Sequence, residues 1–195
     1  MNTAEQIVDA YFRLCRDCFT ISDRKVIAGN NRQIDILAYQ LRDKKAFHIE
    51  VGVTHRENWC PTVAQLGAGF EKKFFGMPRE RLGGSANTDH AKGKSYFDKI
   101  EDTYRHLGLD PSTINRVWVC WMVHDGDNSA PFTLSYTSPR IGRTFNIEVI
   151  SLRDYVIKEL EKAIGTSNYD DVILRTLGFI KQRESQQAVA PEDDD

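Results

Sequence analysis

The sequence of 195 residues is 41% hydrophobic and 28% charged, which is enough apolar material for one buried core and argues against a disordered chain. Its 26 basic and 28 acidic residues give a net charge of −2, which excludes a uniformly basic coat for nucleic acid but permits a local basic patch. No run approaches the roughly 18–20 apolar residues that cross a bilayer, and the first residues lack a signal-peptide pattern. We therefore expect a cytoplasmic protein without a membrane partner.

The start of the chain has the pattern of a helix followed by a strand. Thr3 and Gln6 have the spacing of a capping box, and apolar residues then recur at helical spacing as far as Cys18. Residues 19–28 mix apolar and polar side chains and end at a Gly-Asn-Asn turn, so we expect the first of three strands there.

Two further strands are expected at 33–41 and 46–53, which are rich in apolar and aromatic residues. Only the charged residues 42–45 separate them. So short a polar link predicts that the two strands form an antiparallel hairpin.

The second half of the chain alternates between helical and strand patterns. We expect, in order, a helix after Pro61, a loop over 76–93, a helix over 95–107, a buried strand over 117–123, a polar connection over 125–142, a strand over 146–150, a helix that begins at Ser151 and a last helix over 169–180. Strands separated by helices indicate an α/β fold in which helices flank a mixed central β-sheet. We expect a single domain over 1–183 and a disordered acidic tail over 184–195.

Two acidic residues lie where acids are costly, inside apolar strands. Asp35 stands between Ile34 and Ile36, and Glu50 follows Ile49. A buried carboxylate needs a compensating partner, and in the predicted hairpin the two carboxylates would converge at one place. Two converging carboxylates suit a hard cation, Mg²⁺ or Mn²⁺, which could activate water against a phosphodiester.

These two strands resemble the core of the PD-(D/E)XK nucleases. The resemblance is carried by residues 33–37 (Gln-Ile-Asp-Ile-Leu) and 47–54 (Phe-His-Ile-Glu-Val-Gly-Val-Thr), and the order of elements agrees over residues 4–124. It implies a restriction-endonuclease-like fold with an αβββαβ core, followed here by C-terminal helices. It also implies that Asp35 and Glu50 bind the metal and take part in catalysis.

The resemblance implies several further site residues. The Val51 carbonyl and an acid on the first helix, Glu5 or Asp9, would complete the metal site. Gln65 resembles the glutamine that the branch related to the RecB nuclease domain carries on the following helix, where it would position the water or the strand.

One motif position departs from the family, because Gly52 stands where the family has a lysine that orients the water and offsets charge near the phosphate. Three outcomes are open. Lys72 or Lys73 could replace that lysine from the next helix. Thr54, which shares a strand face with Glu50, could serve instead. Otherwise the fold is retained and cleavage is lost.

A local excess of basic residues lies in and beside the predicted loop. Two acids accompany the six basic residues of this stretch, which are Lys72, Lys73, Arg79, Arg81, Lys92 and Lys94. Such a cluster suits contacts to nucleic-acid phosphates, and the alternative is an ordinary solvated loop.

The sequence therefore predicts a metal-dependent DNA endonuclease, of the kind used in restriction, defence or repair. The alternative is a catalytically inactive nuclease-fold protein that binds nucleic acid or a protein partner. Since many members of the resembling family cut both strands as dimers, a homodimer is a further expectation.

Overall fold

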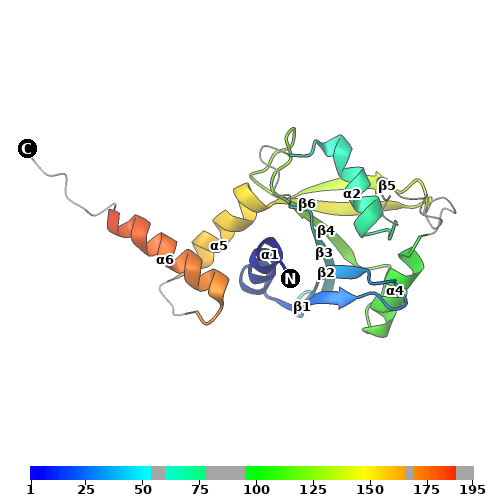
Figure 1. Cartoon of the computed structure of the whole chain (residues 1–195), viewed down its shortest axis with the longest axis horizontal. Helices are drawn as coiled ribbons and strands as arrows, with labels where there is room; N and C mark the ends of the chain where they lie inside the picture. Colours follow the sequence, from blue (N-terminus) through cyan, green and yellow to red (C-terminus); the bar gives the residue numbers. More distant parts are fainter. Residues whose placement is uncertain (54–59, 78–94, 166–168, 188–195) are drawn as a thin grey trace, which may run out of the picture.

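The computed structural model describes residues 1–53, 60–77, 95–165 and 169–187. Within these residues, six strands form one sheet in the order β1-β2-β3-β4-β6-β5 (Figure 1). The strands are β1 (Cys18–Lys25), β2 (Gln33–Gln40), β3 (Lys45–Val51), β4 (Asn115–Cys120), β5 (Phe132–Thr137) and β6 (Thr144–Ser151). In the part of the chain that the structure describes, no helix is both long and apolar enough to cross a membrane.

The sheet is mixed, as the alternation of strands and helices predicts. Strands β1, β2 and β3 pair antiparallel, β4 lies parallel to both β3 and β6, and β5 returns antiparallel to β6. The predicted hairpin is confirmed as β2 and β3, in which Ile36 pairs with Ile49. Continued by one residue, this register sets Asp35 opposite Glu50, so both side chains leave the same face of the sheet.

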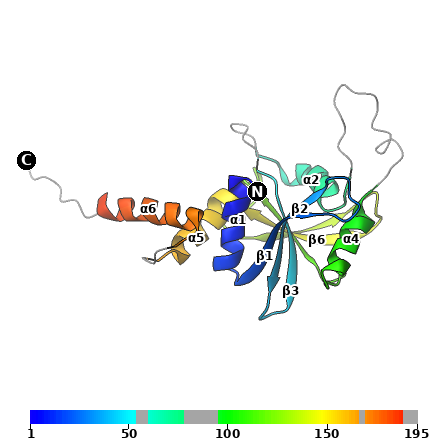
Figure 2. The ribbon, with the colours of Figure 1, turned by 60° about the horizontal axis from the view of Figure 1, so that its bottom comes forward.

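Helices cover both faces of the sheet. They are α1 (Thr3–Leu14), α2 (Leu66–Lys73), α4 (Phe97–His106), α5 (Ile157–Ala163) and α6 (Val172–Gln187). Helices α1 and α5 lie on one face and α2 and α4 on the other, while α6 extends away from the sheet (Figures 1 and 2). A single π-helical turn, Leu152–Val156, precedes α5, and its Ser151 cap accepts a hydrogen bond from the Asp154 amide at 3.0 Å.

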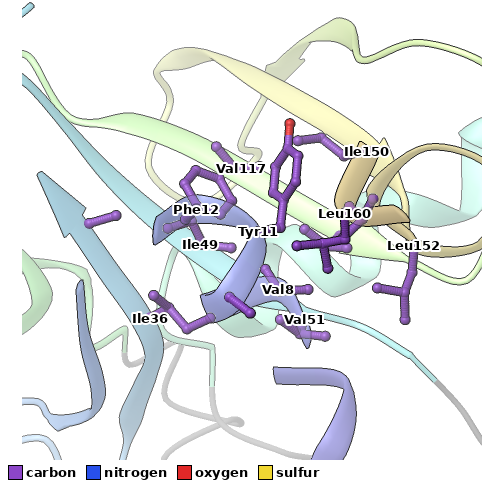
Figure 3. Close-up of a cluster of buried hydrophobic side chains, with 14 of the residues drawn as sticks. Val8, Tyr11, Phe12, Ile36, Ile49, Val51, Val117, Ile150, Leu152 and Leu160 are labelled. Atoms are coloured by element: carbon purple, nitrogen blue, oxygen red, sulfur yellow. The ribbon is translucent and has the colours of Figure 1, made fainter. Parts of the chain in front are cut away.

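The side of the hairpin that faces α1 is occupied by apolar core residues. Alternate strand residues, among them Ile36, Ile49 and Val51, pack there against Val8 and Phe12 of α1 (Figure 3). Because strand side chains alternate between faces, the intervening residues of β2 and β3 point toward α2 and α4. Asp35 and Glu50 are therefore buried between the sheet and these two helices.

Three sequence-based expectations need correction. The first helix begins one residue earlier than expected, because Asn2 and Glu5, not Thr3 and Gln6, form its capping box. The stretch predicted to be a polar connection contains β5, whose residues alternate between half-buried and exposed as on a one-sided edge strand. Helix α6 reaches Gln187, so the first residues of the predicted acidic tail are helical.

Candidate functional site

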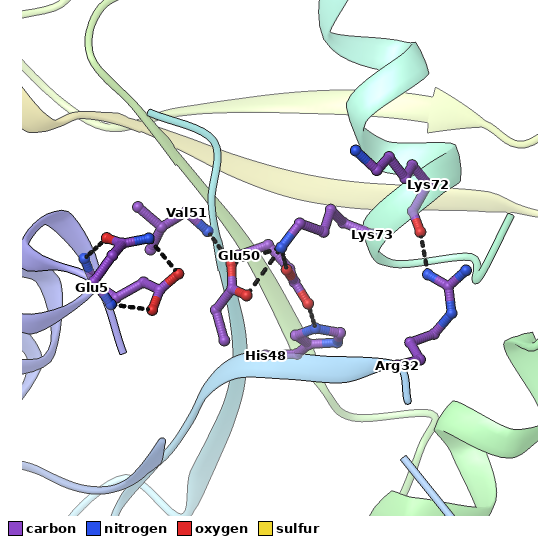
Figure 4. A network of polar contacts seen from close by, with 9 residues as sticks. Glu5, Arg32, His48, Glu50, Val51, Lys72 and Lys73 are labelled. Carbon is purple, nitrogen blue, oxygen red and sulfur yellow. Dashed lines mark hydrogen bonds and ion pairs between the residues drawn. The ribbon is translucent and has the colours of Figure 1, made fainter. Parts of the chain in front are cut away.

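Asp35 and Glu50 converge on one ammonium group, that of Lys73 at the end of α2. Lys73 Nζ lies 2.9 Å from both Asp35 oxygens and 2.8 Å from Glu50 Oε2. Figure 4 shows Lys73 reaching down from α2 toward Glu50 and His48. The two arms of the hairpin and the following helix thus build a three-membered ion cluster from residues that are 15 to 38 positions apart in the chain.

Asp35 is held from two sides. Besides Lys73, the Val51 N–H donates a hydrogen bond to Asp35 Oδ2 at 2.9 Å. Burial and the neighbouring Glu50 carboxylate raise the pKa of Asp35 to about 6, although Lys73 and the Val51 amide oppose this rise. Val51 therefore enters the site through its N–H, whereas the resemblance assigned its carbonyl to the metal.

Glu50 is fully buried, and its two oxygens have different partners. Oε1 lies 2.7 Å from His48 Nε2, and Oε2 faces Lys73 without the alignment of a hydrogen bond. Burial raises the pKa of Glu50, and the charge of Lys73 acts against this. Oε2 thus keeps acceptor capacity at the centre of the cluster.

His48 and Tyr104 extend the cluster inward, and sequence reasoning missed both. The other ring nitrogen of His48, Nδ1, is hydrogen-bonded to the hydroxyl of Tyr104 from α4. Both side chains are fully buried, and this burial lowers the pKa of His48 well below its usual value. The signal for His48 was available, because it stands two residues before Glu50 and so shares its strand face.

Gly52 lacks a side chain because Trp118 fills the space beside it. A Cβ placed on Gly52 would lie 2.2 Å from Trp118 Cζ2, and one on Gly69 of α2 would lie 2.7 Å from Trp118 Cη2. The indole therefore sits in a slot between β3 and α2. A lysine at position 52 cannot coexist with this tryptophan, so the cation that accompanies the carboxylates comes from Lys73.

Gly52→Ala is expected to lower the free energy of unfolding by about 1–3 kcal/mol, since the new methyl group overpacks the slot of Trp118. Urea denaturation measures the change. Combining Gly52→Ala with Trp118→Leu should cost less than the sum of the two single changes. Gly165→Ala is the control, because a Cβ there meets nothing within 4 Å. Equal stability losses at positions 52 and 165 would contradict the slot.

Arg32 holds the end of α2 that carries Lys73. Its guanidinium donates hydrogen bonds to the carbonyls of Lys72, at 2.5 Å, and Met77, at 2.7 Å, and lies over the ring of Tyr96. Lys72 thus joins this network through its carbonyl, and its side chain points away from the two carboxylates (Figure 4). Of the two candidate replacements for the motif lysine, the structure places Lys73 beside the carboxylates.

Three other predicted site residues are engaged elsewhere. Both oxygens of Glu5 are bonded to Asn2 in the helix cap (Figure 4). Asp9 forms an ion pair with Arg13 at 2.8 Å. Gln65 Oε1 accepts from the Thr62 N–H and so caps the short 3-10 helix Val63–Gln65. This turn precedes α2, and about 12 Å of helix separates it from Lys73.

The remaining predicted positions cannot be placed. Arg79, Arg81, Lys92 and Lys94 lie outside the described residues, as does Thr54. Contacts between these basic residues and phosphates therefore stay predictions.

The donors present fit a divalent cation, although incompletely. Among the described residues, no group of three or more His, Cys, Asp or Glu side chains is arranged to hold a metal ion. Asp35 and Glu50 nevertheless offer hard oxygens, and one of these, Glu50 Oε2, is buried without an aligned hydrogen bond. Two carboxylates beside a single ammonium are a set of oxygen donors that a hard cation can share.

Comparisons of the sequence with protein-family models, with curated proteins and with solved structures find no match. What the site does must therefore follow from its own geometry.

Proposed function

We propose that this protein is a metal-dependent DNA endonuclease related to the PD-(D/E)XK nucleases. The observation that carries the proposal is the convergence of Asp35 and Glu50 on Lys73 Nζ, all within 2.9 Å. An acid from each arm of a hairpin and one lysine are the chemical groups of the family motif. Here the lysine comes from α2 instead of the strand.

The topology supports the same proposal. Helix α1, the antiparallel strands β1 to β3, the helices α2 and α4, and the parallel strand β4 follow one another in the order of a restriction-endonuclease-like core. The family has its acids on the second and third strands of this core. The positions of Asp35 on β2 and Glu50 on β3 support the proposal.

Asp35 and Glu50 would hold Mg²⁺ or Mn²⁺ between them. When bound, such an ion polarises the phosphodiester and makes water a better nucleophile. To admit it, Lys73 must give up some of its contacts to the carboxylates, since its ammonium lies between them. The displaced ammonium would then hydrogen-bond the scissile phosphate and offset its charge.

A second candidate is a nuclease-fold protein that binds DNA or a protein partner without cutting. The observation that favours it is the closed cluster itself, in which Lys73 already neutralises part of the carboxylate charge without a metal. A site balanced in this way can persist after catalysis is lost.

Cleavage of supercoiled plasmid DNA in Mg²⁺ or Mn²⁺ distinguishes the two candidates. The nuclease proposal expects the wild type to cut, EDTA to stop it, and Asp35→Ala and Glu50→Ala to abolish cutting. Glu5→Ala is the matched control: it removes only the half of the capping box in which the Glu5 carboxylate accepts from Asn2, and it should leave cleavage intact. Equal residual cleavage in the wild type, Asp35→Ala and Glu50→Ala would refute the nuclease and favour the binding protein.

A further inference from the structure

The two oxygens of Glu50 have different partners, and one of them is held by a buried chain of hydrogen bonds through His48 of β3 and Tyr104 of α4. Oε1 is bound by His48 Nε2 at 2.7 Å, so that only Oε2 faces Lys73. Glu50 and His48 are both 0% exposed, and the His48 ring is fixed in place by edge contacts with Phe74, 4.9 Å between centroids, and Tyr104.

The direction of the hydrogen bonds follows from the partners available. If the Tyr104 hydroxyl donates to Nδ1 of His48, then Nε2 carries the ring proton and donates to Glu50 Oε1. In the opposite arrangement Nδ1 would donate to Tyr104, and among the described residues no acceptor is then seen for the tyrosine hydroxyl proton. The first arrangement gives each of the three groups a partner.

We infer that His48, oriented by Tyr104, is a positioning residue that fixes the Glu50 carboxylate so that Oε2 alone points into the metal site. The inference rests on the proposed function. An unrestrained Glu50 could turn both oxygens toward Lys73 and form the same two-oxygen contact that Asp35 makes. That contact would commit both oxygens of Glu50 to Lys73, whereas in the structure only Oε2 faces the ammonium. A histidine that orients a ligand through its second nitrogen is a common support of metal sites.

Calorimetric titration of the full chain with Mn²⁺ tests the inference. His48→Phe keeps a ring but loses both nitrogens, and it should raise the dissociation constant for Mn²⁺ by about 10–100-fold. His48→Gln places an amide N–H at the same distance along the side chain as Nε2, and should recover most of the affinity. Tyr104→Phe removes only the hydroxyl and should give an intermediate loss. His106→Gln, an exposed histidine of α4, is the control and should bind as the wild type does.

A purely structural role for His48 predicts a different pattern. In that case the two His48 variants and Tyr104→Phe have lower melting temperatures, because each loses buried hydrogen bonds. Those that remain folded nevertheless bind Mn²⁺ like the wild type. That result would overturn the inference, as would a failure of His48→Gln to bind more tightly than His48→Phe when both are folded.

Nitrogen NMR of the metal-free protein separates the inference from the proposed function. A wild type that neither binds Mn²⁺ nor cuts DNA refutes the proposed function, and the His48 tautomer then decides the remaining claim about Glu50. Protonation on Nε2, with a coupling across the bond to Glu50, supports the orientation of the carboxylate. Protonation on Nδ1 overturns it.

Discussion

Lys73→Met is expected to lower the free energy of unfolding by about 3–5 kcal/mol at neutral pH, the usual cost of removing one partner from a buried ion pair. The substitution keeps the unbranched side chain but leaves Asp35 and the fully buried Glu50 facing each other without a cation. The loss should shrink as the pH falls toward 4, because protonation of one carboxyl relieves the repulsion. Urea denaturation at several pH values measures both effects.

Lys72→Met is the matched control for this substitution. It changes the neighbouring residue in the same way, but the Lys72 side chain points away from the carboxylates (Figure 4), so the expected loss is below about 1 kcal/mol. Mn²⁺ should raise the melting temperature of Lys73→Met more than that of the wild type, since the ion can enter the space that the ammonium leaves. Equal stability of the two variants would contradict the central place of Lys73.

The second large effect is a fall in stability as the pH rises from about 4 to 7, caused by Asp35. Its carboxyl has a pKa raised from 3.8 to about 6 in the folded chain, whereas the unfolded chain keeps the ordinary value. Between these two pKa values the folded state binds more protons than the unfolded state, so stability is lost as the pH increases. A difference of about two pKa units corresponds to up to about 3 kcal/mol.

Asp35→Asn isolates this contribution, because asparagine does not titrate. The difference in unfolding free energy between variant and wild type should grow in favour of the variant from pH 4 to 7, while the acids outside the cluster contribute equally to both. A difference that stays constant over this range would show that Asp35 ionises normally in the folded chain. Glu148→Gln, at the ion pair with Arg16 2.7 Å away, gives the comparison with a carboxylate outside the cluster.

Much of the fold could be predicted because its signals are local. The short charged link between two apolar segments predicts the β2–β3 hairpin, and a period of two then puts Asp35 and Glu50 on one face. The edge strand β5 was missed because its flanking prolines suggested a connection, although the alternation of Phe132, Leu134 and Tyr136 with polar residues was present.

The rest of the site depends on contacts that sequence spacing does not encode. Lys72 and Lys73 are adjacent, and only the packing of α2 against the sheet selects Lys73. Tyr104 is remote in sequence from His48, and its hydroxyl reaches the imidazole only because α4 lies over β3. Glu5 could be assigned to the metal from its place on the first helix, yet its own helix cap takes up its carboxylate.

Because Trp118 fills the slot between β3 and α2, the residue types that fit at positions 52, 69 and 118 depend on one another. Since the indole lies beside Gly52 and Gly69, a larger residue at either position overpacks this slot unless position 118 becomes smaller. A lysine at position 52 would therefore have to be accompanied by a smaller residue at position 118. Gly52→Lys alone would place its side chain against Trp118 and destabilise the fold, whatever the new ammonium could do in the site.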